Sequence, residues 1–339
     1  MPFLQELIPE VFNELADRMT STDLPGLTTG FNLLDEMLGG GLQRQRLSYL
    51  VGDSGVGKSW LATWIAIQGA KGLLSDPTKR PRTGYILEDE SDPIRVMVKD
   101  KTDKLPVIVF WSLEMAELPI ITRIITQVAE AFMHTYLDSG KLMQGKLGAP
   151  IGTPEWNVAR DACTEVYKYI VEELGKYVYL EFEATKPSEM ERVLDSLCAT
   201  RDVCMLVVDY FRLIDQVAID GNMTTQQADR STALKTMMRK YDCHVMSIFD
   251  INREGQKAAG PQTYHMRGGV AAHYDADLVL TLAKGEDSQP GDGHVMLRVA
   301  KGRYVGQSEV ELKIELSSGK VELWNQRDDR VYDEGRDDG

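Results

Sequence analysis

The chain alternates short apolar runs with amphipathic segments over most of its length. In residues 3–19, apolar side chains recur at the i, i+3, i+4 spacing of one helix face, and acidic side chains occupy the other face. Pro9 either kinks this predicted helix or marks its first turn. Residues 21–26 then break the chain with Ser, Asp, Pro and Gly. The helix must bury its apolar face on its own domain or on a neighbouring subunit, and periodicity does not choose between them.

Beyond residue 26 the pattern predicts strands that alternate with helices. Each predicted strand is a short apolar run, and each predicted helix shows a longer repeat with polar positions. This alternation indicates an α/β fold with a mainly parallel central sheet flanked by helices, and with a small antiparallel edge at the end of the chain. Strands are expected at residues 47–51, 107–111, 177–181, 205–208, 244–249, 278–282, 295–300 and 310–314, and helices at 30–37, 60–70, 118–136, 154–174, 187–200 and 226–241.

These elements define the domain organisation. Residues 1–24 are expected to form a linker helix and its linker, residues 25–325 a single α/β domain, and residues 326–339 an acidic, disordered tail. Residues 72–105 carry mixed charge and several prolines, which predicts an inserted surface excursion with a hairpin around residues 84–98.

Composition narrows the class of protein. The chain of 339 residues is 43% apolar, yet its longest apolar run is too short to cross a membrane, and its N-terminus lacks the basic stretch of a signal peptide. The four cysteines show no metal-binding spacing, so reduced thiols in a cytoplasmic protein are expected. The net charge of −14 argues against general nucleic-acid binding, although a ring can be acidic outside and basic inside.

The most specific pattern lies between the predicted strand 47–51 and the predicted helix 60–70. Residues 52–59 match the P-loop pattern G-x-x-x-x-G-K-[ST] without a mismatch. Glycines at such a turn let backbone N–H groups close around phosphate oxygens, and the helix N-terminus adds partial positive charge. Lys58 would reach the β- and γ-phosphates of ATP, and Ser59 would hold Mg²⁺. The expected nucleotide-binding residues are Gly52, Asp53, Ser54, Gly55, Val56, Gly57, Lys58, Ser59 and Trp60.

Two other predicted strands lead into carboxylates. The strand 205–208 runs into Asp209, the Walker B arrangement, and this carboxylate would hold Mg²⁺ together with Ser59. The strand 107–111 leads to Glu114, which would orient and deprotonate the water that attacks the γ-phosphate. The alternative for Glu114 is a cap or a first-turn acid of the helix that follows.

A basic pair completes the candidate chemical groups. Lys301 and Arg303 lie two apart in an extended segment, so their side chains would point the same way. They could reach the γ-phosphate of an adjacent subunit as an arginine finger and stabilise charge in the transition state. Taken alone, the pair could as well be a solvated part of the surface.

Together these segments resemble the ATPase domain of the DnaB-type hexameric replicative helicases, within the wider RecA-like family of P-loop NTPases. The resemblance covers nearly the whole chain and rests on residues 26–35, 52–59, 112–115, 208–213, 231–235, 275–280 and 301–303. It implies a six-membered ring with ATP at the subunit interfaces and single-stranded DNA through the centre. It implies that Glu114 is the catalytic base, that Lys301 and Arg303 act on the neighbour's ATP, and that the N-terminal helix docks on the next subunit.

The resemblance also implies two DNA-binding loops, near residues 216–225 and 253–268. Cations of the second loop would track DNA phosphates through the channel, although an ordinary surface loop is the alternative. These cations are Arg253, Lys257 and Arg267.

The chain departs from the family at its phosphate sensor. A polar neutral residue is expected after the strand 244–249, but Asp250 stands there, and a carboxylate would repel the γ-phosphate unless it is paired with an arginine or protonated. Either Asn252 takes the place of the sensor, or the coupling of hydrolysis to DNA is altered. A Gln that the family places after the Walker B tyrosine is also missing, and Phe211 and Arg212 stand in its place.

Other departures concern the subfamily. The helical domain that recruits primase in bacterial relatives is missing from this sequence, which fits a compact phage or plasmid helicase, or one whose primase is a separate chain. The glycine-rich residues 268–271 resemble strand-exchange recombinases, and residues 39–42 resemble recombinases and KaiC-like ATPases.

The favoured interpretation is an ATP- and Mg²⁺-dependent DNA helicase that unwinds duplex DNA at a replication fork while translocating on single-stranded DNA as a ring. It would work in bacterial or phage-infected host cytoplasm, with a primase or a helicase loader as a possible partner. The alternatives are a RecA- or KaiC-like ATPase that does not unwind, and a nucleotide-gated assembly or loader factor.

Overall fold

The computed structural model describes residues 25–76, 104–215, 223–251, 270–285, 288–289 and 291–324. The predictions of an N-terminal linker helix, of a hairpin at 84–98 and of an acidic tail fall outside these residues. So do most of both predicted DNA loops, together with Asn252, Arg253, Lys257 and Arg267. Residues 223–225, assigned to the first loop, begin a helix.

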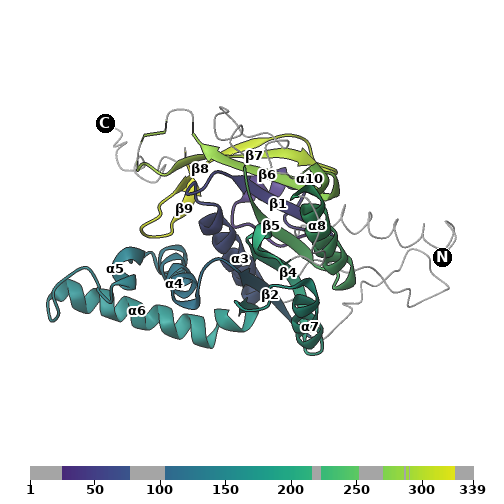
Figure 1. The fold of residues 1–339 in the computed structure, drawn as a ribbon. Helices are drawn as coiled ribbons and strands as arrows, with labels where there is room; N and C mark the ends of the chain where they lie inside the picture. The colour runs from purple at the N-terminus through teal and green to yellow at the C-terminus, as the bar shows by residue number, and fades with distance from the viewer. Residues whose placement is uncertain are drawn as a thin grey trace, which may run out of the picture.

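The described residues form one nine-stranded sheet in the order β3-β2-β4-β5-β1-β6-β7-β8-β9 (Figure 1). Strands from β3 to β6 in this order pair in parallel, and β6 to β9 pair antiparallel. The mainly parallel sheet with an antiparallel edge is therefore confirmed. The strands are β1 (Leu47–Gly52), β2 (Leu105–Ser112), β3 (Val178–Glu181), β4 (Arg201–Asp209), β5 (His244–Asp250), β6 (Leu278–Lys284), β7 (His294–Gly302), β8 (Glu309–Ile314) and β9 (Val321–Leu323).

Helices cover both faces of the sheet. Helices α3 and α4 lie on one face, α7, α8 and α10 lie on the other, and α5 and α6 extend away from the sheet beyond α4 (Figure 1). None of the described helices is long and apolar enough to span a membrane. The helices are α2 (Asn32–Met37), α3 (Lys58–Ser75), α4 (Glu117–Met133), α5 (Ser139–Met143), α6 (Pro154–Glu172), α7 (Pro187–Cys198), α8 (Met223–Lys240) and α10 (Val270–Asp275).

Every predicted strand and helix of the main domain has a counterpart, with ends that differ by a few residues. The sequence does not predict α5, α10 or β9, because elements of five, six and three residues are too short to show a period. The surface excursion was predicted to begin at residue 72, which is wrong: residues 72–75 continue α3, and Leu73 is fully buried there.

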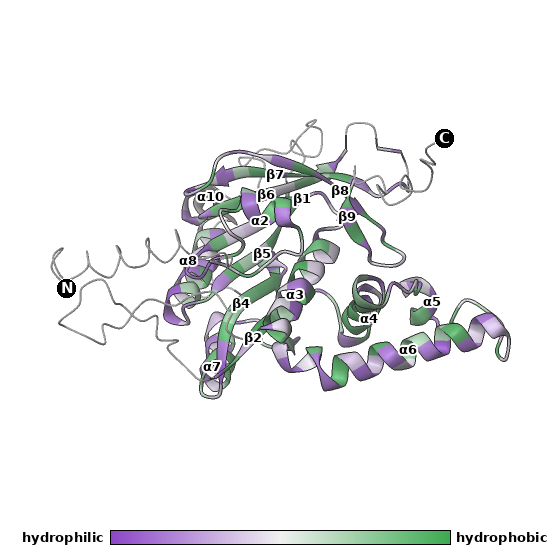
Figure 2. Cartoon of the chain, turned by 180° about the vertical axis from the view of Figure 1, so that it is seen from behind, coloured by the Kyte–Doolittle hydropathy of each residue, from purple (hydrophilic) through white to green (hydrophobic). Residues whose placement is uncertain are grey.

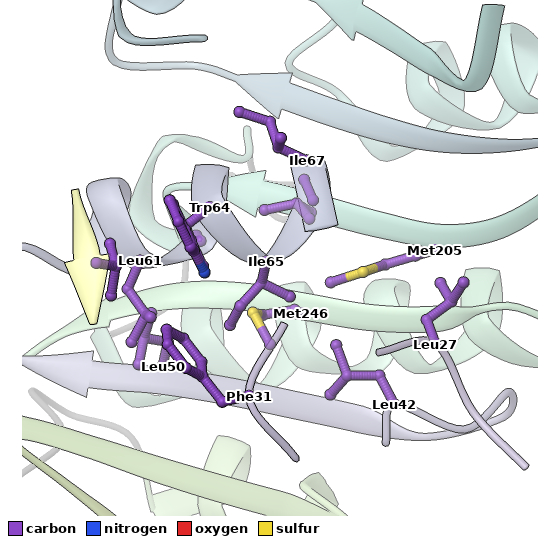
Figure 3. Close-up of a cluster of buried hydrophobic side chains, with 14 of the residues drawn as sticks. Leu27, Phe31, Leu42, Leu50, Leu61, Trp64, Ile65, Ile67, Met205 and Met246 are labelled. Atoms are coloured by element: carbon purple, nitrogen blue, oxygen red, sulfur yellow. The ribbon is translucent and has the colours of Figure 1, made fainter. Parts of the chain in front are cut away.

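Strand side chains alternate between two apolar cores. In β1, Leu50 belongs to the core under α3, whereas Tyr49 and Val51 belong to the core on the opposite face. In the first core, Ile65 of α3 lies beside Met246 of β5 (Figure 3). Figure 2 shows β4 and β5 as predominantly hydrophobic and α6 as striped. A strand buried on both faces needs apolar residues at successive positions, which explains the continuous apolar runs in the sequence.

A buried carboxylate organises the segment that precedes β1. Asp35 is 1% exposed, and its side chain accepts hydrogen bonds from Thr28 Oγ1 at 2.6 Å, Thr29 Oγ1 at 2.7 Å and Thr29 N at 2.7 Å. Its carbonyl oxygen accepts from Gly40 N and Gly41 N. Gly41 has a φ of 81°, and a Cβ there would lie 2.5 Å from Leu27 O, so this turn requires glycine.

Asp35→Ala should lower the free energy of unfolding by about 3 kcal/mol, because it leaves buried hydroxyl and N–H donors without an acceptor. Urea unfolding followed by circular dichroism measures the change. Glu36→Ala is the matched control on the exposed side of the same helix, with an expected effect below about 0.5 kcal/mol. Equal effects of the two substitutions would contradict the role assigned to Asp35.

Candidate nucleotide-binding site

The candidate site lies where four neighbouring parallel strands end. β2, β4, β5 and β1 are consecutive in the sheet, and parallel strands present their carboxyl ends on one edge. A cavity of about 230 Å³ opens at this edge. Its lining includes Lys58, Ser59, Glu114, Arg123, Asp209 and Asp250. The structure therefore brings together the P-loop, both predicted carboxylates and the residue at the sensor position.

The P-loop presents the start of α3 to this cavity. Gly57 precedes the helix with a φ of 104°, and Gly55 has a φ of 77°, so both positions favour glycine. Gly57 has no side chain to cap the helix, and the first-turn N–H groups of α3 therefore remain available to an acceptor. An uncapped helix N-terminus behind a glycine turn favours the binding of a phosphate.

Lys58 is buried and held by three acceptors. Its Nζ donates to Gly52 O at 2.9 Å and to Asp53 O at 2.8 Å, and it lies 3.1 Å from Asp250 Oδ1. An ammonium group has three N–H donors, so each donor has one partner. Asp250 is thus paired with a cation, but this cation is the P-loop lysine and not the arginine that was expected.

Asp209 is a buried carboxylate next to the P-loop. It is 1% exposed, and neither carboxylate oxygen accepts a hydrogen bond of normal geometry from the described residues. Burial raises its pKa to about 6, although the Ser59 hydroxyl and the Arg123 guanidinium both favour the charged form. A buried, unsatisfied carboxylate beside a hydroxyl fits Mg²⁺, which takes oxygen ligands and binds through one or two protein groups plus phosphate.

Glu114 lies at the mouth of the cavity. Leu113 N and Glu114 N both donate to Asp209 O, at 2.7 and 3.3 Å, and these bonds join the ends of β2 and β4. α4 begins at Glu117, after Ala116 as its N-cap, so Glu114 is neither a cap nor a first-turn acid. That alternative is wrong, and the Glu114 side chain is exposed towards the cavity that it lines.

The sequence does not single out Arg123, which also lines the cavity. It is 8% exposed and lies 4.6 Å from the centroid of the Trp60 ring, and its Nη2 lies 3.3 Å from Met115 Sδ. Its Nε and Nη1 are buried without a hydrogen-bond partner among the described residues. Burial lowers the pKa of Arg123, while Asp209 and Glu114 oppose that shift. The sequence feature that could have indicated Arg123 is a cation among the apolar positions on the buried face of α4.

A larger hollow also borders the P-loop and shares Gly55 and Leu316 with the first cavity. It measures about 1010 Å³, borders Gly55 and Val56, and is walled by residues of β7, β8 and β9. His294 and Trp324 stack in it, with ring centroids 4.0 Å apart and planes at 9°.

Residues 26–322 match the DnaB-like helicase C-terminal domain family. The chain belongs to this family. The replicative DNA helicase DnaB of Treponema pallidum (strain Nichols) is 26% identical over 314 residues, which are 91% of this chain and 59% of that protein. The replicative DNA helicase DnaB of Buchnera aphidicola subsp. Baizongia pistaciae (strain Bp) is 26% identical over 189 residues, which are 55% of this chain and 37% of that protein. The chain thus spans only part of the length of each curated relative.

Solved structures share the fold. The ATPase domain of G40P superposes with a TM-score of 0.73 at 16% identity, over 95% of this chain and 98% of that chain. A structure of a DnaB-like replicative helicase and its interactions with primase gives 0.72 at 16% identity, over 94% of this chain and 68% of that chain. The RecA-like α/β fold predicted from the sequence is therefore confirmed.

The basic pair of this DnaB-like domain lies at the opposite end of β1 from the P-loop. Leu278 of β6 pairs with both Ser48 of β1 and Gly302 of β7, which places Lys301 and Arg303 level with the start of β1. The P-loop begins at the far end of this six-residue strand, about 17 Å away. The pair therefore does not reach the P-loop of its own chain.

Both cations of the pair are held by neighbouring backbone groups. Lys301 Nζ donates to His273 O, and Arg303 Nη2 donates to Tyr274 O at 2.8 Å. Arg303 Nη1 also lies 3.3 Å from Asp277 Oδ1. The two side chains thus point towards the same helix end, that of α10, as their spacing predicts.

Asp209→Asn should stabilise the protein in the absence of nucleotide and Mg²⁺. The folded-state pKa of about 6 lies above the ordinary value of 3.8, so the folded state binds the proton more tightly than the unfolded state. The destabilising contribution of the carboxylate therefore grows as the pH rises from about 4 to about 6, and it persists above that range. The gain should reach up to about 3 kcal/mol at pH 7 and should vanish near pH 4.

Thermal unfolding at pH 4, 5, 6 and 7 measures this gain. Asp161→Asn on the exposed surface of α6 changes the net charge equally and should leave stability unchanged within about 0.5 kcal/mol. A gain that does not depend on pH, or a loss at pH 7, would show that burial of the Asp209 charge is not costly.

Proposed function

We propose that the chain is the ATP-hydrolysing motor of a ring-shaped DNA helicase. It would translocate on single-stranded DNA and unwind duplex DNA at a replication fork, in the cytoplasm of a bacterium or of a phage-infected host. The observation that carries the proposal is the convergence of Lys58, the buried carboxylate of Asp209 and the exposed Glu114 on one cavity. Membership of the DnaB-like family supports it, as do relatives named as replicative helicases.

ATP would extend across both hollows. The cavity of about 230 Å³ lies below the usual range of small-molecule pockets, so it suits the phosphates and not a whole nucleotide. The hollow of about 1010 Å³ meets it at Gly55 and Leu316 and offers an aromatic wall at Trp324. We assign the phosphates to the first cavity, and the base and sugar to the second.

Each residue at the phosphate end would have a separate task. The amide groups at the start of α3 and Lys58 bind phosphate oxygens, and Arg123 adds a second cation behind them. Asp209 and Ser59 would hold Mg²⁺, which neutralises phosphate charge and orients the leaving group. Glu114 lies at the solvent side of the cavity, where it would accept the proton of the attacking water.

Hydrolysis would require a second subunit. Arg303 and Lys301 lie far from their own P-loop, so we assign them to the γ-phosphate bound by a neighbour in a hexameric ring. Single-stranded DNA would pass through the centre of the ring, along the segments 216–222 and 253–268. Because one structural relative is described with primase interactions, primase is a candidate partner, and a helicase loader is another.

ATP turnover and strand separation test the enzyme class. Wild type should hydrolyse ATP faster with single-stranded DNA and should unwind a forked duplex, and Glu114→Gln should lower both rates at least about a hundredfold because it removes the base. The variant should still bind ATP. Turnover without unwinding would instead support a RecA- or KaiC-like ATPase, and ATP binding without turnover in wild type would support a nucleotide-gated assembly factor.

Mixing two inactive variants tests the finger in trans. Arg303→Ala keeps its P-loop and lacks the finger, whereas Lys58→Ala keeps the finger and lacks the P-loop lysine. In a mixed ring at equal amounts, about a quarter of the interfaces would combine an intact P-loop with an intact finger. ATPase activity should therefore reappear in the co-assembled mixture, and each variant alone should stay inactive. Continued inactivity of a verified mixed ring would contradict action in trans.

A further inference from the structure

We propose that Asp250 competes with the terminal phosphate of ATP for Lys58 and thereby sets the preference of the site between triphosphate and diphosphate. The inference rests on the proposed function, since it concerns the same cavity. It starts from one contact, the 3.1 Å separation between Lys58 Nζ and Asp250 Oδ1.

The contact uses the one donor of Lys58 that no backbone group takes. Gly52 O and Asp53 O accept from the ammonium at 2.9 and 2.8 Å, and both belong to the P-loop itself. Asp250 supplies the third partner from the end of β5, where it is level with Gly52 in the parallel pairing of β1 and β5. The P-loop lysine contacts the β- and γ-phosphates in this class of site, so a phosphate oxygen and the Asp250 carboxylate need the same donor.

The competition is unequal for the two nucleotides. The Lys58 side chain is 8% exposed and the Asp250 side chain 30%, so water screens their charges only in part. A diphosphate has to displace the carboxylate from Lys58. A triphosphate has to do the same and also brings further negative charge next to a carboxylate that is fixed at the strand end. Placing like charges next to each other in a binding site costs more than a factor of ten in affinity.

Removal of this charge should therefore favour the triphosphate. Asp250→Asn keeps the shape of the side chain and restores a polar neutral residue at the position. Equilibrium titration of the full chain with Mg²⁺-ADP and with the Mg²⁺ β,γ-imido analogue of ATP gives the ratio of the two dissociation constants. We expect Asp250→Asn to shift this ratio at least about tenfold in favour of the triphosphate analogue, which corresponds to about 1.4 kcal/mol.

Three variants control for structural effects. Asp250→Glu keeps the charge and should retain the wild-type ratio. Asp161→Asn removes an exposed charge on α6 and should also retain it. Asp250→Ser is a second neutral variant, which should show the same shift and which replaces Asp250→Asn in the test if Asp250→Asn does not fold. Melting temperatures establish which variants are folded.

The outcomes separate this inference from the proposed function. A ratio that is unchanged within about twofold in the neutral variants, or that shifts towards ADP, overturns the role of Asp250 while the nucleotide site stands. Failure of wild type to bind either nucleotide overturns the proposed function and the inference together. A shift in the neutral variants that is absent from Asp250→Glu and Asp161→Asn supports competition for Lys58.

Discussion

The burial of α3 against the central sheet is the contact on which the rest of the site depends. Leu61, Ile65 and Leu73 of this helix are at most 1% exposed, and each large apolar side chain buried in this way stabilises the fold by about 1.5 to 3 kcal/mol. A helix enclosed on so many sides does not rotate about its axis. Its uncapped N-terminus therefore stays directed at the edge where β1, β2, β4 and β5 end, and the P-loop needs only glycine geometry to present its amides there.

The charged side chains around the phosphate cavity do not balance one another. Among the described residues that line it, Glu114, Asp209 and Asp250 carry negative charge, and Lys58 and Arg123 carry positive charge. If all five are ionised, the balance is negative, which is unfavourable for a polyanion. Under the proposed function, a divalent cation between Asp209 and the phosphates would reverse the sign, and the guanidinium assigned to a neighbouring chain would add to it. The charge balance of the cavity thus favours a divalent cation beside Asp209, whereas the shape of the cavity does not require one.

Local patterns in the sequence predict most of the fold and much of the site. Lys58 was predictable from the P-loop pattern, and Asp209 and Glu114 were predictable because each lies at or just beyond the end of an apolar strand. Parallel strands bring such residues to one edge. Arg123 was not, since a cation in a helix becomes a site residue only through the packing of α4 beside Trp60. The partner of Asp250 was not predictable either, because the ion pair depends on the register between β1 and β5. Short elements such as α10 lack the length that makes a period visible.

The P-loop and the basic pair lie at opposite ends of β1. The P-loop follows Gly52 at one end, and Arg303 lies beside Asp277 at the other, where the Asp277 carboxylate also accepts from Leu47 N at 3.0 Å. One chain therefore presents its phosphate site and its basic pair on separate surfaces. An interface that joins the two is head to tail, and repetition of a head-to-tail contact closes into a ring or continues as a filament. β1 carries the phosphate site at one end and lies beside the basic pair at the other. The register of the sheet therefore fixes the distance between the two surfaces of each chain, and this distance constrains any head-to-tail interface that joins them.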